Sequence, residues 1–320
     1  MMQSIVAFER SQSMKDGIIY AGGAFRPAAD AAVSVFDHGL LYGDGVFEGI
    51  RAYNGRVFKL ERHIERLFES ARAIRLRIPV PQEDVEALVL ETCRRNGIVD
   101  GYIRLLVTRG AGDLGLDPSA CPRPDIIVIA RAGVTLYKRA PNHGITAVTS
   151  AFRRNAADAT SPAIKSLNYL NNVLARIEAT DRGADEAILL DRDGHVAEAT
   201  ADNVFIVTER AVVTPPTSTN LRGITRETIL QLAEGLGIRT EERAFALFDL
   251  WSAREAFMCG TMAEVVPIAS VDGRTIGSGT PGPTTLRLMA AYGEFVCSTG
   301  TPIEAGAVPA VAGAGAGYRV

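Results

Sequence analysis

The chain has 320 residues, of which 47% are apolar and 22% are charged, proportions that are ordinary for a globular protein. A chain of this length usually forms two domains or one large one. The net charge of −3 offers no basic surface for nucleic acid or anionic membranes, so we expect neither as a partner. No run approaches the roughly 18 apolar residues of a membrane span, and the first residues do not resemble a signal peptide. The four cysteines are widely separated, which favours a reducing, cytoplasmic setting and no metal site.

The first half of the chain reads as short strands followed by two helices and two longer strands. Asn54-Gly55 between two strand-like runs is a strong hairpin signal. Apolar residues spaced three and four apart predict a helix over residues 60–76, and a second helix over 83–96 ends at Gly97. The runs 102–108 and 125–130 predict strands.

The second half repeats this mixture, with strand pairs between residues 187 and 214, strands at 257–259 and 265–271, and helices over 224–236 and 283–296. Strands dominate both halves, with helices packed outside, so the predicted class is α+β in two domains. The boundaries that we expect are a flexible arm over 1–16, a small α+β domain over 17–131, a linker over 132–142, a large α+β domain over 143–300 and a disordered tail over 301–320.

One lysine, Lys165, lies at a strand-to-helix junction near the middle of the sequence. Pro162 disfavours helix upstream, and apolar residues from Leu167 to Ile177 predict a helix that begins near Ser166 and buries that stripe. Such a lysine can pack the apolar stem of its side chain against the protein while its ammonium group stays in water. Alternatively, it can be a desolvated amine that forms a Schiff base.

Two further stretches could bind a phosphate. Arg66, at the edge of the buried face of the 60–76 helix, is either a solvated arginine or a bidentate phosphate ligand. Thr225 is expected to be the N-cap of the helix over 224–236, and a helix N-terminus also binds anions through its free N–H groups. Gly223 beside it permits close backbone approach, and Ile224 adds a further N–H donor.

Two more stretches could serve the same chemistry. Glu198 lies between alanines on a strand, where it is either exposed or accepts a hydrogen bond from a protonated ring nitrogen. The stretch from Cys259 to Glu264 predicts a strand that enters a tight turn, whose N–H groups could hold an anion. One lysine, one carboxylate and three anion sites are the components of a pyridoxal-phosphate enzyme.

At this point the sequence resembles the fold-type IV pyridoxal-phosphate enzymes (the D-amino-acid-aminotransferase-like fold), and among them the branched-chain amino-acid aminotransferases. The matching stretches occur in the order of the family and span nearly all of the chain between the arm and the tail. They are Tyr42–Arg51, His63–Leu67, Tyr102–Arg104, Lys165–Asn172, Glu198, Asp202–Phe205, Leu221–Arg226 and Gly260–Glu264.

The resemblance implies pyridoxal 5′-phosphate as cofactor. Lys165 would form the Schiff base with it and then shuttle the substrate proton, and Glu198 would keep the pyridine nitrogen protonated. Tyr169 would hydrogen-bond the phenolic oxygen, and Leu221 would pack on the ring. The implied phosphate ligands are Arg66, Gly223, Ile224, Thr225 and Thr261.

The resemblance also implies a substrate pocket and a reaction. The reaction would be ping-pong transamination of L-leucine, L-isoleucine or L-valine with 2-oxoglutarate, which gives the 2-oxo acid and L-glutamate. We expect Arg51 at the pocket edge to receive the γ-carboxylate of the acceptor. The residues implied to orient the α-carboxylate are Tyr102, Arg104, Met262 and Ala263, and those implied to line the apolar pocket are Tyr42, Phe47 and Gly49.

Two other activities on this scaffold stay open, a D-amino-acid transaminase and an aminodeoxychorismate lyase. The D-amino-acid members use an arginine in a Val-Thr-Arg-Gly segment for the carboxylate, and Val107–Gly110 has that sequence. The resemblance further implies a homodimer, or a larger assembly, in which the Gly112–Gly115 loop closes the pocket of the partner subunit.

Overall fold

The computed structural model describes residues 17–133 and 143–303, which divide into two compact units. Of the described residues, the first unit contains 17–133 and 299–303, and the second contains 143–298. The predicted arm, most of the predicted linker and the tail beyond 303 lie outside the described residues, so those boundaries stay predictions. Across the two described ranges, no helix has the length and apolar character to cross a membrane.

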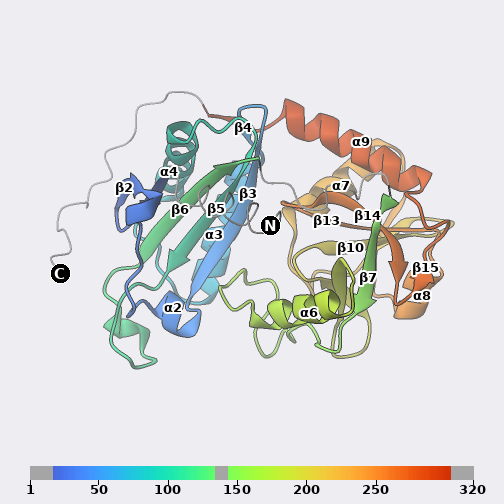
Figure 1. The fold of residues 1–320 in the computed structure, drawn as a ribbon, viewed down its shortest axis with the longest axis horizontal. Helices are drawn as coiled ribbons and strands as arrows, with labels where there is room; N and C mark the ends of the chain where they lie inside the picture. Colours follow the sequence, from blue (N-terminus) through green and yellow to red (C-terminus); the bar gives the residue numbers. More distant parts are fainter. Residues whose placement is uncertain (1–16, 134–142, 304–320) are drawn as a thin grey trace, which may run out of the picture. The chain divides into compact units, whose positions relative to one another are not determined.

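The first unit is a seven-stranded antiparallel sheet in the order β16-β4-β3-β5-β6-β1-β2. The helices α3 (Leu60–Ala73) and α4 (Gln82–Arg95) pack on one face of it and enclose its core (Figure 1). The strands are β1 (Ile18–Ala21), β2 (Ala24–Pro27), β3 (Gly45–Tyr53), β4 (Arg56–Val57), β5 (Gly101–Thr108), β6 (Asp125–Ala132) and β16 (Thr301–Pro302). The short helices are η1 (Ala28–Asp30), α2 (His38–Tyr42) and η2 (Pro118–Ala120).

Local sequence signals explain these elements. The buried stripe of α3 includes Ile64, Leu67 and Ala71, as its spacing predicts. Asn54 and Gly55 both have positive φ, of 49° and 72°, which matches the predicted two-residue hairpin turn between β3 and β4. The prediction of a tail from residue 301 is wrong at its start, because β16 pairs with β4 and extends the sheet edge.

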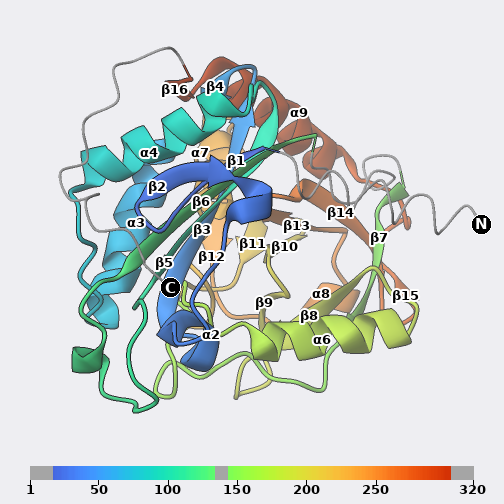
Figure 2. The same cartoon turned by 60° about the vertical axis from the view of Figure 1, so that its left-hand side comes forward.

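The second unit is a nine-stranded mixed sheet in the order β12-β11-β10-β13-β14-β7-β8-β9, with β15 paired to β14 outside this row. The helices α7 and α9 lie side by side against β13 (Figure 2). The strands are β7 (Ile145–Thr149), β8 (Glu186–Leu190), β9 (Val196–Ala199), β10 (Asn203–Val207), β11 (Val212–Thr214), β12 (Thr240–Glu242), β13 (Glu255–Gly260), β14 (Glu264–Val271) and β15 (Arg274–Thr275). The helices are α6 (Leu170–Asp181), α7 (Ile224–Gly235), α8 (Leu247–Trp251) and α9 (Pro283–Ser298).

The helix after Lys165 differs from its prediction in start and in orientation. It begins at Leu170 rather than near Ser166. Leu170 is 69% exposed and Ile177 is half exposed, whereas Ala175 and Ala179 are fully buried against the sheet. Small side chains allow close approach of α6 to β8, and the larger apolar stripe faces outward.

Candidate active site

Five predicted substrate residues of the first unit lie on one face of the β3–β5 pair. Phe47, Gly49 and Arg51 alternate along β3, and the register places Arg104 opposite Gly49 and Tyr102 opposite Arg51. The Arg104 guanidinium carbon lies 4.7 Å from the Phe47 ring centroid and 5.4 Å from the Tyr102 ring centroid. A Cβ on Gly49 would lie 2.2 Å from the Tyr102 hydroxyl oxygen. This face therefore presents two aromatic side chains, two arginines and a tyrosine hydroxyl that lies against a required glycine.

Tyr42, the sixth predicted pocket residue of this unit, holds the Gly112–Gly115 loop. It ends α2, and its hydroxyl donates to the Leu114 carbonyl at 2.5 Å. Its ring lies edge-on to His38, whose Nε2 is 2.8 Å from the Asp113 carbonyl. These contacts fix the loop that is expected to reach a partner subunit.

Arg66 lies on the opposite face of β3 from Phe47, in a buried ionic cluster. Its Nε and Nη2 donate to the two oxygens of Glu48 at 2.7 and 2.8 Å, and His63 Nδ1 is 2.8 Å from Oε2. Burial by itself would raise the pKa of the Glu48 carboxyl, but Arg66 and His63 hold that pKa well below its usual range. Of the two interpretations of Arg66, the solvated helix arginine is wrong, since its side chain is buried and bound in bidentate fashion to Glu48. Its role as a phosphate ligand stays a prediction.

Arg109, the arginine of the Val-Thr-Arg-Gly segment, is also buried in the first unit. Its Nε and Nη2 donate to the Asp44 carboxylate at 2.9 and 2.8 Å. It also donates to the carbonyls of Ile74 and Arg75, each at 2.8 Å. Through these four hydrogen bonds the guanidinium holds the end of β5 against the C-terminus of α3. Arg109 is therefore disfavoured as a ligand for a substrate carboxylate.

Replacing Arg109 by methionine is therefore expected to lower the free energy of unfolding by about 2–4 kcal/mol, because Asp44 is left without its partner. Arg104→Met is the matched control and should cost only about 1 kcal/mol, the size of its ring contacts. Urea unfolding of both variants measures the difference. Equal stability of the two variants would contradict the structural role of Arg109.

In the second unit, Lys165 lies in a non-helical segment that leads into α6. The lysine is half-buried, and its Nζ lies 5.9 Å from the ring centroid of Tyr169, the N-cap residue of α6. Ser166 beside it is buried. The structure thus brings together the predicted reactive amine and the predicted partner of the phenolic oxygen.

Glu198 on β9 is only 4% exposed, so the exposed-strand interpretation is wrong. Arg154 forms an ion pair with its Oε1. Its Oε2 accepts from the Leu221 N–H at 3.1 Å and from Asn203 Nδ2 at 3.4 Å. We did not predict Arg154 or Asn203 as site residues. A buried carboxylate requires a partner, but the sequence does not show which arginine supplies it.

The N-terminus of α7 is open toward an anion. The N-cap is Gly223 and not Thr225, which corrects the prediction: Thr225 is the second residue of the helix. Within the described residues, no side chain caps this helix end. A Cβ on Gly223 would lie 2.0 Å from Asn203 Oδ1, so glycine is needed here. The N–H groups of Ile224 and Thr225 are therefore available to an anionic ligand.

The predicted turn at the end of β13 is confirmed. Gly260 pairs with Glu264, and Thr261, Met262 and Ala263 form the turn between β13 and β14. Glu264 has a positive φ of 64°, as expected where a chain reverses tightly.

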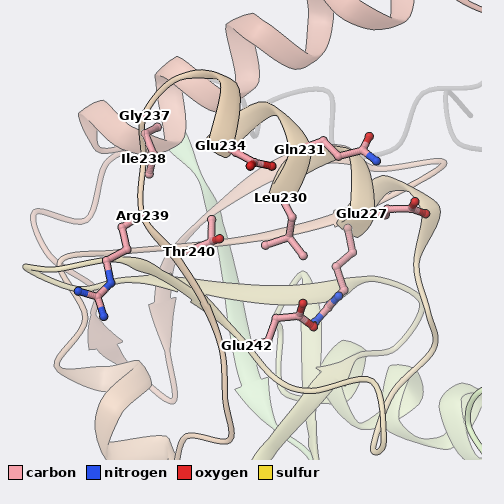
Figure 3. Close-up of a pocket in the computed structure, with 10 residues that line it drawn as sticks. Glu227, Leu230, Gln231, Glu234, Gly237, Ile238, Arg239, Thr240 and Glu242 are labelled. Carbon is pink, nitrogen blue, oxygen red and sulfur yellow. The ribbon is translucent and has the colours of Figure 1, made fainter.

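A cavity of about 660 Å³ lies between α7 and the segment Gly237–Glu242 (Figure 3). Its wall is rich in charged side chains, such as Glu234 and Arg239. None of the predicted site residues lines it.

Comparison with known proteins gives a consistent result. A family model described as "Amino-transferase class IV" matches residues 45–271. A protein of Methanocaldococcus jannaschii is 49% identical over 278 residues, which are 87% of this chain and 96% of that protein. The branched-chain-amino-acid aminotransferase of Pseudomonas aeruginosa is 38% identical, over 89% of this chain and 95% of its own length.

Solved structures agree with the sequence relatives. A T.th. branched-chain amino acid aminotransferase with pyridoxamine 5′-phosphate matches with a TM-score of 0.85 and 40% identity, covering 89% of this chain and 95% of that one. Further structures of the T.th. protein hold N-(5′-phosphopyridoxyl)-L-glutamate and 4-methylvaleric acid.

Proposed function

The chain belongs to the class IV aminotransferase family, and we propose that, as a pyridoxal-phosphate-dependent branched-chain transaminase, it passes the amino group of L-leucine, L-isoleucine or L-valine to 2-oxoglutarate. L-Glutamate and the branched 2-oxo acid are the products. The observation that carries the proposal is the set formed by Lys165, buried Glu198 and the open N-terminus of α7 in one unit.

The residues of the second unit suit the cofactor. The uncapped N–H groups of Ile224 and Thr225, with the Thr261 hydroxyl, are expected to bind the phosphate, and Arg66 is expected to add a guanidinium N–H. A side chain at Gly223 would collide with Asn203, so only glycine fits at this helix N-cap. When bound, the cofactor supplies an electron sink for the charge left on the substrate Cα.

The protein residues perform the proton chemistry. With the cofactor bound, the Lys165 amine would be the base that takes the substrate Cα proton and the acid that gives it up again. Glu198 would keep the ring nitrogen of the bound cofactor protonated, and Arg154 with the Leu221 N–H holds that carboxylate in place. Leu221 would pack on the cofactor ring, and Tyr169 would donate a hydrogen bond to its phenolic oxygen.

We expect the β3–β5 face and the turn after β13 to bind the substrate. Tyr102 and Arg104 orient the α-carboxylate together with the Met262 and Ala263 N–H groups. Phe47, Gly49 and Tyr42 line the apolar side-chain pocket, and Arg51 receives the γ-carboxylate of the acceptor. The T.th. protein has solved complexes with an apolar acid and with a glutamate adduct, which supports dual use of one pocket.

A direct assay separates this function from its alternatives. The protein is expected to transaminate L-leucine with 2-oxoglutarate at least about 100-fold faster than D-alanine, because Arg109 is held by Asp44 and cannot serve a D-substrate. Paired steady-state assays with the two donors measure this ratio. Activity with D-alanine alone would overturn the proposal, and pyruvate release from aminodeoxychorismate without an acceptor would identify a lyase.

We also propose a cytoplasmic homodimer built on the first unit. Leu114 on the predicted partner-facing loop and Leu116 directly after it are 69% and 78% exposed, and Phe36 and Leu40 beside that loop are also exposed. The Gly112 N–H donates to the Phe36 carbonyl, so these apolar side chains belong to one continuous region. Burial of such a region against a second copy would remove it from water.

A further inference from the structure

Asn203 is a buried amide at the start of β10, beside the carboxylate that is expected to serve the ring nitrogen. Its side chain contacts two separate segments of the second unit. The Nδ2 atom lies 3.4 Å from Glu198 Oε2 and donates to the Leu221 carbonyl at 3.1 Å. A buried amide that binds two segments through one nitrogen fixes them relative to each other.

Leu221 closes a ring of hydrogen bonds around this amide. Its N–H donates to Glu198 Oε2 at 3.1 Å, the same oxygen that Asn203 approaches. Its carbonyl accepts from Asn203 and also from the Gly223 N–H, at 2.8 Å. Because Gly223 is the N-cap of α7, the carboxylate, the amide and the start of this helix form one connected network.

The oxygen of the Asn203 amide packs on the same N-cap. A Cβ on Gly223 would lie 2.0 Å from Asn203 Oδ1, so the amide lies directly against the glycine backbone. Gly223 has a φ of −67° and a ψ of 129°, a conformation that any residue adopts. Glycine is therefore required here by the position of Asn203 and not by the backbone conformation.

The proposed cofactor makes a specific demand on this network. Its ring nitrogen and its phosphate belong to one small molecule and lie at a nearly fixed separation. The groups that are expected to serve them belong to different elements, Glu198 to β9 and the N–H donors to the start of α7. A ligand of fixed geometry binds tightly only where its partners are already held at the matching separation.

We propose that Asn203 holds these two ends of the cofactor site in register, so that a displacement at one end is felt at the other. The inference rests on the proposed function, because it concerns the same cofactor. Asn203 acts through Glu198 and through the N-terminus of α7, and it is a positioning residue.

Two analogues of the cofactor report on the two ends separately. Pyridoxal lacks the phosphate, and 1-deaza-pyridoxal phosphate has a C–H group in place of the ring nitrogen. Dissociation constants measured on cofactor-free protein give the preference for pyridoxal phosphate over each analogue. In Asn203→Ala both preferences are expected to fall by about tenfold, the effect of one lost hydrogen bond to a charged group.

Gly223→Ala tests the link without removing the amide. The added methyl group displaces Asn203 from the α7 side, so the preference for the ring nitrogen should also fall about tenfold, although Glu198 itself is unchanged. The double change Gly223→Ala with Asn203→Ala removes the collision. Its effect should therefore be smaller than the sum of the two separate effects.

Thr214→Val is the matched control for lost stability. Thr214 is fully buried and donates to the carbonyl of Val204 on the same strand, β10, at 2.9 Å. This variant should be less stable but should keep both preferences. If Asn203→Ala keeps either preference, or Gly223→Ala keeps the preference for the ring nitrogen, the role of Asn203 is overturned and the proposed function stands. A wild type that prefers pyridoxal phosphate over neither analogue would overturn both.

Discussion

Replacing Lys165 by alanine is expected to remove the absorbance band at roughly 410–430 nm and to lower the rate of L-leucine transamination by more than about 10⁴-fold. The variant loses both the attachment of the cofactor and the base that moves the Cα proton. Absorbance after incubation with pyridoxal phosphate, together with a single-turnover assay, measures the two losses.

Lys165→Arg is the matched control for charge. It keeps a cation at this position but cannot form the carbon–nitrogen bond, because a guanidinium is protonated throughout. It should therefore be as inactive as the alanine variant. A band that persists in either variant would show that another group holds the cofactor.

The second large effect is expected for Glu198→Gln, which should lower the turnover rate by about 10²–10³-fold. A neutral amide cannot keep the ring nitrogen protonated. The same change leaves Arg154 buried without its anion, so stability should also fall, by roughly 3 kcal/mol. Turnover rate and urea unfolding must therefore be measured on the same samples.

Two control variants separate these effects. The double change Glu198→Gln with Arg154→Met removes the unpaired charge, so it should recover stability without recovering activity. Glu255→Gln changes another buried carboxylate of the second unit, which accepts the Thr285 N–H at 2.7 Å, and should lower stability alone. Recovery of activity in the double variant would contradict the role of Glu198.

Local signals predicted most of the secondary structure. The α3 stripe and the Asn54-Gly55 turn depend on spacing and backbone preference within a few residues, and both are confirmed. The prediction that α6 buries its larger apolar stripe is wrong. Periodicity shows that a helix has an apolar face, but it does not show whether the sheet of the same unit covers that face. There, Ala175 and Ala179 pack on the sheet, while Leu170 stays exposed.

The ordered motifs predicted the candidate site residues, whose roles stay proposals, but they did not predict the contacts that support these residues. Lys165 and the turn at Thr261 follow from short stretches of sequence. The Arg154–Glu198 pair joins residues 44 positions apart, and Arg66 binds Glu48 from a different element. Such pairing depends on the tertiary fold, and residue type alone does not select one arginine among several. The same limit applies to Arg109. Its Val-Thr-Arg-Gly context suggests a ligand for a substrate carboxylate, whereas the structure shows four hydrogen bonds within the protein.

The most direct test of the proposed function is a stoichiometric half-reaction with protein loaded with pyridoxal phosphate. One addition of L-leucine should remove the band at roughly 410–430 nm and release one equivalent of 4-methyl-2-oxopentanoate, and 2-oxoglutarate should then restore the band with formation of L-glutamate. A band that L-leucine leaves unchanged, and that D-alanine removes, would contradict the account.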